Sequence, residues 1–146
     1  MYHSNSVVRG RNTTGIKELN ELVTMAAAPG VSLRERKYVE GLVHRFNKRA
    51  AKAIEVFNEI LADHPTDILA LRFVVDLCLV TGQHDQMRDS AARVMPFWTS
   101  SKSPLKKFVH GLYAFSLVES GDYPKAEVVA RQVRVVCLSI ALLNNL

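Results

Sequence analysis

The sequence predicts an all-α protein whose helices pair into hairpins that stack in the order of the chain. Apolar residues recur at helical spacing along most of its length, and no segment alternates apolar and polar residues for long enough to predict a strand. Glycine and proline divide these helical segments at short intervals, which favours antiparallel pairs of neighbouring helices. We expect about seven helices.

The chain begins with a polar, aperiodic stretch, residues 1–15, which we expect to be a flexible tail. From Ile16 to Ala26 apolar residues recur at helical spacing, and a Pro-Gly pair ends this helix. The sequence therefore predicts a single helical-repeat domain over residues 16–146.

The first predicted hairpin covers about residues 33–62. Ser32 followed by Glu35 has the spacing of a capping box, which predicts that a helix begins at Leu33. The second helix of this pair carries a clear apolar stripe and must end before Pro65, because the residue before proline avoids the helical conformation.

The second predicted hairpin covers about residues 67–95. We expect Thr66 to cap its first helix and Gly82 to end that helix, since glycine readily adopts the left-handed conformation found there. Its second helix should stop at Pro96.

A loop over Phe97–Ser103 is expected before the third hairpin, at about residues 104–142. Pro104 suits the first position of a helix, where its missing N–H is not needed. Gly121 should end that helix, and the last helix should run from Pro124 towards Leu142.

Gly121, Tyr123 and Ala126 form a Gly-x-Tyr-x-x-Ala turn, which resembles the turn of a tetratricopeptide repeat. The same offsets recur twice earlier in the chain, at Gly82, His84 and Met87 and at Lys48, Ala50 and Ala53. The step from Ala53 to Met87 is 34 residues, the period of that repeat. The step from Met87 to Ala126 is 39, and the predicted loop at Phe97–Ser103 accommodates the difference.

The resemblance implies a right-handed α-solenoid, in which each hairpin covers an apolar face that its neighbour cannot bury alone. Small residues let the helices approach closely, and turn residues set the angle between them. The residues expected to serve repeat packing are Gly41, Ala53, Phe57, Pro65, Gly82, Ala91, Gly121, Tyr123 and Ala126.

A more particular resemblance rests on three segments, Asp63–Leu71, Gln86–Trp98 and His110–Phe115, together with the turn at Tyr123. They are similar to the tetratricopeptide repeat protein 38 family over about residues 34–132. The resemblance implies a cytoplasmic protein, with association with extracellular vesicles as a second location, and carries no established activity. Because that family extends in both directions, we expect this chain to be a fragment or a truncated product.

In repeats of this class the first helix of each hairpin lines a concave face that binds partners. Transferred residue by residue, the candidate partner-binding residues are Tyr38, Leu42, Arg45, Leu69, Arg72, Asp76, Phe108 and Phe115. The resemblance thus predicts a scaffold for a protein or peptide partner of unknown identity. The alternative is that helices absent from this chain cover the same face.

The net charge of +5 is concentrated in one hairpin. Residues 34–52 contain seven Lys or Arg and two Glu, whereas the rest of the chain has twelve of each sign. Weak nucleic-acid binding by this hairpin is an alternative function. We favour a solvated helix face, because no aromatic or glycine-rich nucleic-acid motif accompanies the charges.

No catalytic constellation, metal box or phosphate-binding loop is recognisable, so we expect no enzyme activity, no metal and no cofactor. The alternative is a non-catalytic fragment of a larger enzyme. Trp98, with Phe97 and Pro96, is expected to fill the gap between hairpins rather than to bind a ligand.

The sequence has no apolar stretch long enough to span a membrane and no visible secretory signal, and its two cysteines form no framework. These features favour the cytoplasm. In the last helix, apolar residues at Val133, Val136, Ile140 and Leu143 would form an uncovered stripe, which predicts self-association.

Overall fold

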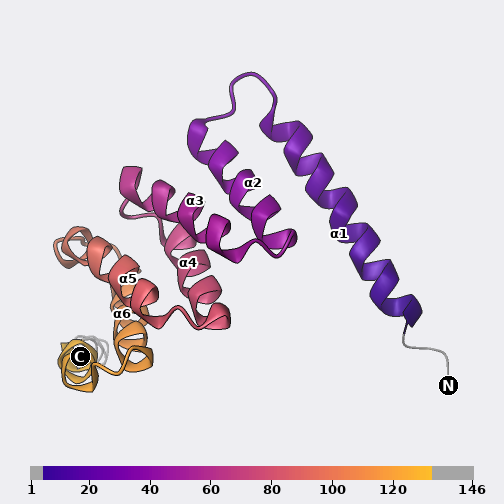
Figure 1. Ribbon diagram of the computed structural model, residues 1–146. Helices are drawn as coiled ribbons and strands as arrows, with labels where there is room; N and C mark the ends of the chain where they lie inside the picture. The colour runs from indigo at the N-terminus through magenta and orange to yellow at the C-terminus, as the bar shows by residue number, and fades with distance from the viewer. Residues whose placement is uncertain (1–4, 133–146) are drawn as a thin grey trace, which may run out of the picture. The chain divides into compact units, whose positions relative to one another are not determined.

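The computed structural model describes the backbone of residues 5–132 and the side chains of residues 15–132, and every regular element in this part of the chain is an α-helix (Figure 1). The all-α prediction is confirmed. The helices are α1 (Asn5–Ala26), α2 (Leu33–Phe46), α3 (Ala50–Asp63), α4 (Ile68–Thr81), α5 (His84–Thr99) and α6 (Lys106–Glu119), and residues 123–132 are helical as well. The remainder of the last predicted helix, with its apolar stripe, lies outside the described residues.

The chain divides into two compact units between Phe57 and Asn58. In the first unit α1 contacts α2. Helix α1 begins at Asn5, earlier than the expected start at Ile16, and no proline in the added stretch forbids a helix there. The predicted capping box is confirmed: Ser32 Oγ accepts the Glu35 N–H at 3.2 Å, and Glu35 Oε2 accepts the Ser32 N–H at 2.8 Å.

Three turns share one backbone conformation. Lys48, Gly82 and Gly121 have φ angles of 59°, 70° and 83°, in the left-handed region. Each turn is closed by the same pair of hydrogen bonds, in which the left-handed residue and the residue after it donate back to the preceding helix. The donor N–H groups, acceptor carbonyls and distances are Lys48 to Arg45 at 3.0 Å, Arg49 to His44 at 2.9 Å, Gly82 to Leu79 at 3.3 Å, Gln83 to Cys78 at 2.9 Å, Gly121 to Val118 at 3.0 Å and Asp122 to Leu117 at 2.9 Å. The residues that the sequence assigned to one repeat position thus occupy equivalent places in the backbone.

The cap of α4 is Asp67 and not Thr66, which corrects the sequence prediction. Asp67 Oδ1 accepts the N–H of Ala70 at 3.1 Å. Both residue types suit an N-cap. Asp67 takes this position because its carboxylate reaches a free N–H group of the first turn.

Helix α5 continues through Pro96 to Thr99, so the prediction that it stops at Pro96 is wrong. Proline inside a helix removes one backbone donor. Here the added turn carries Trp98, which is buried and whose Nε1–H donates to the carbonyl oxygen of Pro65 at 3.2 Å. Burial of this large ring offsets the lost hydrogen bond, and the expected role of Trp98 in filling the interior is confirmed.

The start of α6 also differs from the prediction. The helix begins at Lys106, while Pro104 and Leu105 form a turn before it. Ser103 accepts the N–H of Leu105 at 3.2 Å through its Oγ, so it caps this turn rather than the helix. The last helix likewise starts at Tyr123, one residue before Pro124.

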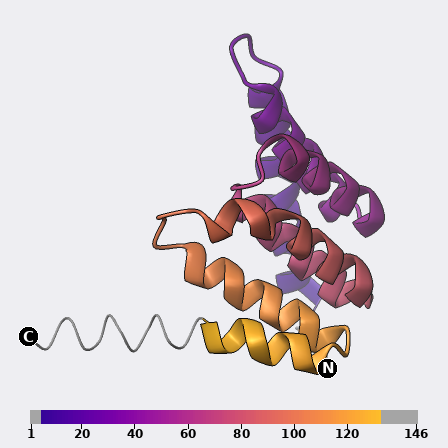
Figure 2. The same cartoon turned by 90° about the vertical axis from the view of Figure 1, so that its left-hand side faces the viewer.

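In the second unit neighbouring helices pack in sequence order. Helix α5 contacts α4 and α6, and α4 also contacts α6. The segment 123–132 runs alongside α6 (Figure 2). Successive helices supply the apolar side chains of this core, among them Leu71, Val74, Val75, Met87, Ala91, Val94, Val109, Leu112, Leu117 and Ala126.

Candidate interaction surface

Two stripes of residues on α4 and α6 repeat the same spacing. On α4 the stripe is Leu69, Arg72, Asp76 and Leu79, and on α6 it is Phe108, Gly111, Phe115 and Val118. Both advance by three, four and three residues, which keeps each set on one side of its helix. Since α4 and α6 contact each other, the stripes belong to neighbouring helices. We call these eight residues the α4/α6 surface.

The apolar members of the α4/α6 surface are exposed although they lie on helices that supply the core. Leu69 is 52% exposed, Phe108 48% and Phe115 38%. Single exposed apolar residues are common on proteins, whereas several on two contacting helices make these helices a candidate interaction site. Leu79 and Val118 extend the exposed apolar character along both helices.

The charges on this surface are paired with each other. Arg72 Nε donates to Asp76 Oδ2 at 3.0 Å, one helical turn along α4. The pair leaves the α4/α6 surface without net charge among its eight residues. An exposed pair of this kind stabilises the helix little, so its main effect is to present a neutral surface.

The third predicted member of the surface, on α2, has different surroundings in the first unit. Tyr38 is half-buried, and its ring lies 6.0 Å from that of Phe57 at a tilt of 55°. Leu42 and Arg45 line a pocket of about 390 Å³ together with α1, from which Leu19 and Leu22 contribute. In this unit an amphipathic helix of the same chain therefore reaches the predicted face.

Seven of the nine residues predicted to serve repeat packing fall into two groups. Ala53, Phe57, Ala91 and Ala126 are buried, as is Gly41. The four side chains fill the interior between helices, and Gly41 leaves room there because it has no side chain. Gly82 and Gly121 act through their backbone, as described above.

Two of these predicted packing residues have other surroundings. Tyr123 is 65% exposed, so its ring contributes little to the core. Pro65 is half-buried and provides the carbonyl that accepts the Trp98 hydrogen bond.

A small pocket in the second unit is not indicated by the sequence. Its volume is about 160 Å³, and it is lined by Asn58, Leu61, Ala62, Pro65, Ser90, Arg93, Val94 and Phe97. Arg93 Nη2 donates to Asn58 Oδ1 at 2.9 Å and to Ser90 Oγ at 3.1 Å. The pocket is smaller than the roughly 300 Å³ of most ligand sites. Its polar groups already bond one another, and no spacing in the sequence signals that they meet.

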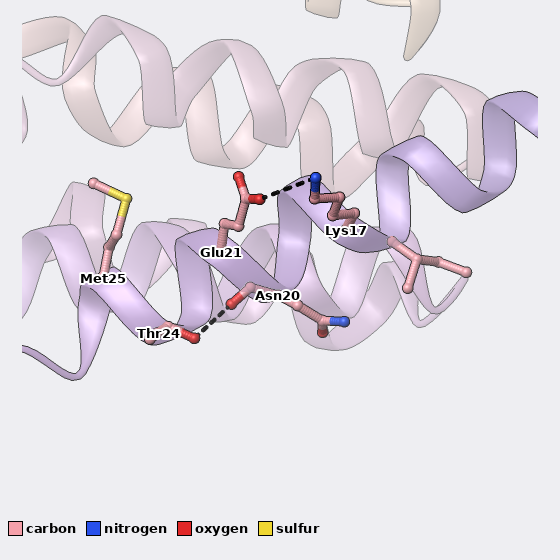
Figure 3. Close-up of a pocket in the computed structure, with 6 residues that line it drawn as sticks. Lys17, Asn20, Glu21, Thr24 and Met25 are labelled. Carbon is pink, nitrogen blue, oxygen red and sulfur yellow. Dashed lines mark hydrogen bonds and ion pairs between the residues drawn. The ribbon is translucent and has the colours of Figure 1, made fainter.

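A third hollow lies on the surface of α1 (Figure 3). Lys17 Nζ and Glu21 Oε1 are 4.0 Å apart across one turn, and Thr24 donates to the carbonyl of Asn20 at 2.9 Å. Met25, at its end, is 66% exposed. All of its lining residues come from one helix, so nothing encloses a ligand there.

The titratable side chains form no recognisable catalytic group in the described part of the chain. His84 Nδ1 lies 3.7 Å from Glu119 Oε2, and His44 Nε2 lies 3.9 Å from Glu40 Oε1. Among residues 15–132, whose side chains the structure describes, no cluster of three or more could hold a metal ion. Burial raises the pKa of the Cys78 thiol to about 11, which keeps it protonated at neutral pH.

Neither a protein-family model nor a solved structure matches this chain. Among the helices that the structure describes, none has the length and apolar character needed to cross a membrane.

Proposed function

We propose that this chain is a helical-repeat scaffold of the tetratricopeptide kind and that it binds a protein partner through the α4/α6 surface. The observation that carries the proposal is the pair of matched stripes on contacting helices, with exposed Leu69, Phe108 and Phe115 and an internally paired Arg72 and Asp76. Aromatic side chains that are accessible before binding are frequent anchors of protein interfaces.

The shared geometry of three turns supports the repeat class. Lys48, Gly82 and Gly121 are left-handed and are followed by helices that bury Ala53, Met87 and Ala126 at the same offset. A right-handed solenoid of successive hairpins accounts for such recurrence, because each repeat must present the same packing face to its neighbour. Membership of the tetratricopeptide repeat protein 38 family and a cytoplasmic location remain parts of this proposal, and rest on the sequence segments alone.

The first unit suggests the form of the partner. There α1 contributes Leu19 and Leu22 to a pocket whose other wall includes Leu42 and Arg45 of α2. These α2 positions correspond in the repeat to Asp76 and Leu79 on α4 and to Phe115 and Val118 on α6. We therefore propose that the partner presents an amphipathic helix with leucines about one turn apart.

Substitution of the aromatic anchors tests this function. Phe108→Ser with Phe115→Ser removes the two largest side chains of the α4/α6 surface without touching the core. The matched control replaces two exposed apolar residues outside this surface, Val80→Ser with Val128→Ser.

Partners that co-purify with the unmodified chain are identified, and the affinity of each is then measured with purified proteins. We expect the Phe variant to bind at least roughly 30-fold more weakly, since interface anchors contribute about 2 kcal/mol or more, and the Val control to bind normally. Equal affinity of the Phe variant and the unmodified chain would reject the surface. A bound partner peptide without helical circular dichroism would reject the helical form of the partner.

A further inference from the structure

The turn between α2 and α3 carries positive charge, and the nearest acidic residues in sequence, Glu40 and Glu55, lie outside it. Residues 41–54 include four Lys or Arg, namely Arg45, Lys48, Arg49 and Lys52, and no Asp or Glu. All four are exposed. We call these four residues the basic turn.

Most of the basic turn has no ion-pair partner among the residues that the structure describes. Lys48, Arg49 and Lys52 make no ion pair with a described carboxylate. Cations elsewhere in the chain do: Arg88 Nη1 lies 2.8 Å from Asp85 Oδ1, and Arg131 Nη2 lies 2.5 Å from Glu127 Oε1. The difference separates charges that are locally neutralised from charges that are available to an external anion.

The backbone under these charges is held in place. Lys48 and Arg49 donate their N–H groups to the end of α2, at 3.0 and 2.9 Å, and the Arg49 carbonyl accepts the Ala53 N–H at 3.1 Å. Helix α3 has no acidic residue in its first turn. Its dipole therefore adds positive potential where Lys52 already stands, an arrangement that is unfavourable until an anion offsets it.

We propose that the basic turn binds the phosphate backbone of a single-stranded nucleic acid, without preference for base sequence. Phosphodiesters supply several negative charges at close spacing, which suits several cations on one short turn. Phe46, the nearest aromatic residue, packs towards α1: a Cβ built on Gly15 would lie 3.3 Å from Phe46 Cε2. The ring is nevertheless 40% exposed, so its open part is available to stack on an unpaired base beside the basic turn.

Salt dependence of binding tests the proposal on the full chain. Fluorescence anisotropy of a labelled single-stranded oligouridine is measured between about 50 and 200 mM salt, where counterion release dominates affinity. The test variant is Lys48→Gln with Arg49→Gln and Lys52→Gln. The control removes three paired cations and so the same net charge, with Lys17→Gln, Arg88→Gln and Arg131→Gln.

We expect the test variant to bind at least tenfold more weakly at the low-salt end. The slope of log affinity against log salt should fall by about two, since each phosphate contact on a single strand contributes about 0.7. The control should keep most of the slope and affinity. Equal losses in both variants would show an effect of net charge alone and would overturn the proposal, as would no measurable binding by the unmodified chain.

Two further arms distinguish other anions. Vesicles rich in phosphatidylserine and a polyglutamate peptide are titrated under the same conditions. Tighter binding to vesicles than to RNA would replace the nucleic acid by a membrane surface, and equal binding of polyglutamate would remove the requirement for phosphate. The Phe108 and Phe115 variant should bind RNA normally, so this proposal and the proposed scaffold function stand or fall separately.

Discussion

The ring of Phe57 occupies the space that a side chain at Gly41 would need. A Cβ built on Gly41 would lie 2.6 Å from Phe57 Cζ, which is shorter than the contacts that real Cβ atoms make. Phe57 is fully buried, so its ring has little room to withdraw.

We therefore expect Gly41→Ala to lower the free energy of unfolding by about 1–3 kcal/mol through overpacking. Gly111→Ala is the matched control, because Gly111 lies within α6 and a Cβ there meets no atom within 4 Å. That substitution should be neutral or stabilise by up to about 1 kcal/mol, since alanine favours helix. Urea denaturation followed by circular dichroism measures both, and a harmless Gly41→Ala would contradict the close approach.

At the equivalent left-handed residues Lys48, Gly82 and Gly121, substitutions should change the stability of the chain in opposite directions. Gly82→Ala and Gly121→Ala should each destabilise the chain by about 1–2 kcal/mol, because φ angles of 70° and 83° strain any side chain. Lys48 already bears this cost at 59°, so Lys48→Gly should be neutral or stabilising by up to about 1 kcal/mol. Thermal and urea unfolding measure each change. A loss of stability in Lys48→Gly would mean that the lysine side chain contributes more than its backbone strain.

Trp98 should be the most sensitive residue of the last turn of α5. Trp98→Ala is expected to cost about 3–5 kcal/mol, through the loss of a buried ring. Trp98→Phe should cost less, but still lose about 0.5–1.5 kcal/mol with the hydrogen bond to Pro65. Its neighbour Phe97 is 53% exposed, so Phe97→Ala should change little. Because Trp98 is the single tryptophan of the sequence, unfolding is followed by circular dichroism.

The raised pKa of Cys78 predicts both slow labelling and a pH effect. At pH 8, with a pKa of about 11, only about one thiol in a thousand is ionised, so a Cys137→Ser chain should react slowly with thiol reagents until it unfolds. The folded chain favours the neutral thiol. Its contribution to the free energy of unfolding is therefore complete below pH 9.0, the pKa of an ordinary thiol, and is lost as the pH rises from 9.0 to about 11.

Cys78→Ala provides the reference for this pH dependence, since all other groups titrate in both chains. The difference in unfolding free energy between the two should shrink as the pH rises through that window. A constant difference, or fast labelling of the native chain, would show that the thiol is more accessible than its burial indicates.

Local signals in the sequence predicted most of the helix boundaries. These signals act within one turn of the chain and need no distant partner. Examples are the capping box of Ser32 and Glu35, and the glycines that end helices, Gly82 and Gly121. Lys48 is instructive, because residue type alone does not predict a left-handed lysine. Its offset from Ala53 gave it the same repeat position as Gly82 and Gly121, and its backbone is left-handed like theirs.

The boundaries that the sequence missed depend on contacts between distant residues. Pro96 marks a helix end by local rules, but the burial of Trp98 and its bond to Pro65 extend α5 by a turn. The resemblance to a repeat class predicted the candidate surface, and the i,i+4 spacing of Arg72 and Asp76 already allows their ion pair. The exposure of Phe108 depends on how its helix packs and is seen only in the structure. The pocket around Arg93 brings together residues far apart in the chain and has no sequence signal at all.

Gly111 leaves a notch on α6 between Phe108 and Phe115, open to solvent on the side where a Cβ would project. A longer group attached at this position can thus reach outward without disturbing the helix that carries it. A photoreactive amino acid incorporated there would form a covalent bond with whatever molecule rests on the two phenylalanines. The glycine thereby offers a direct way to mark the occupant of this surface inside a living cell.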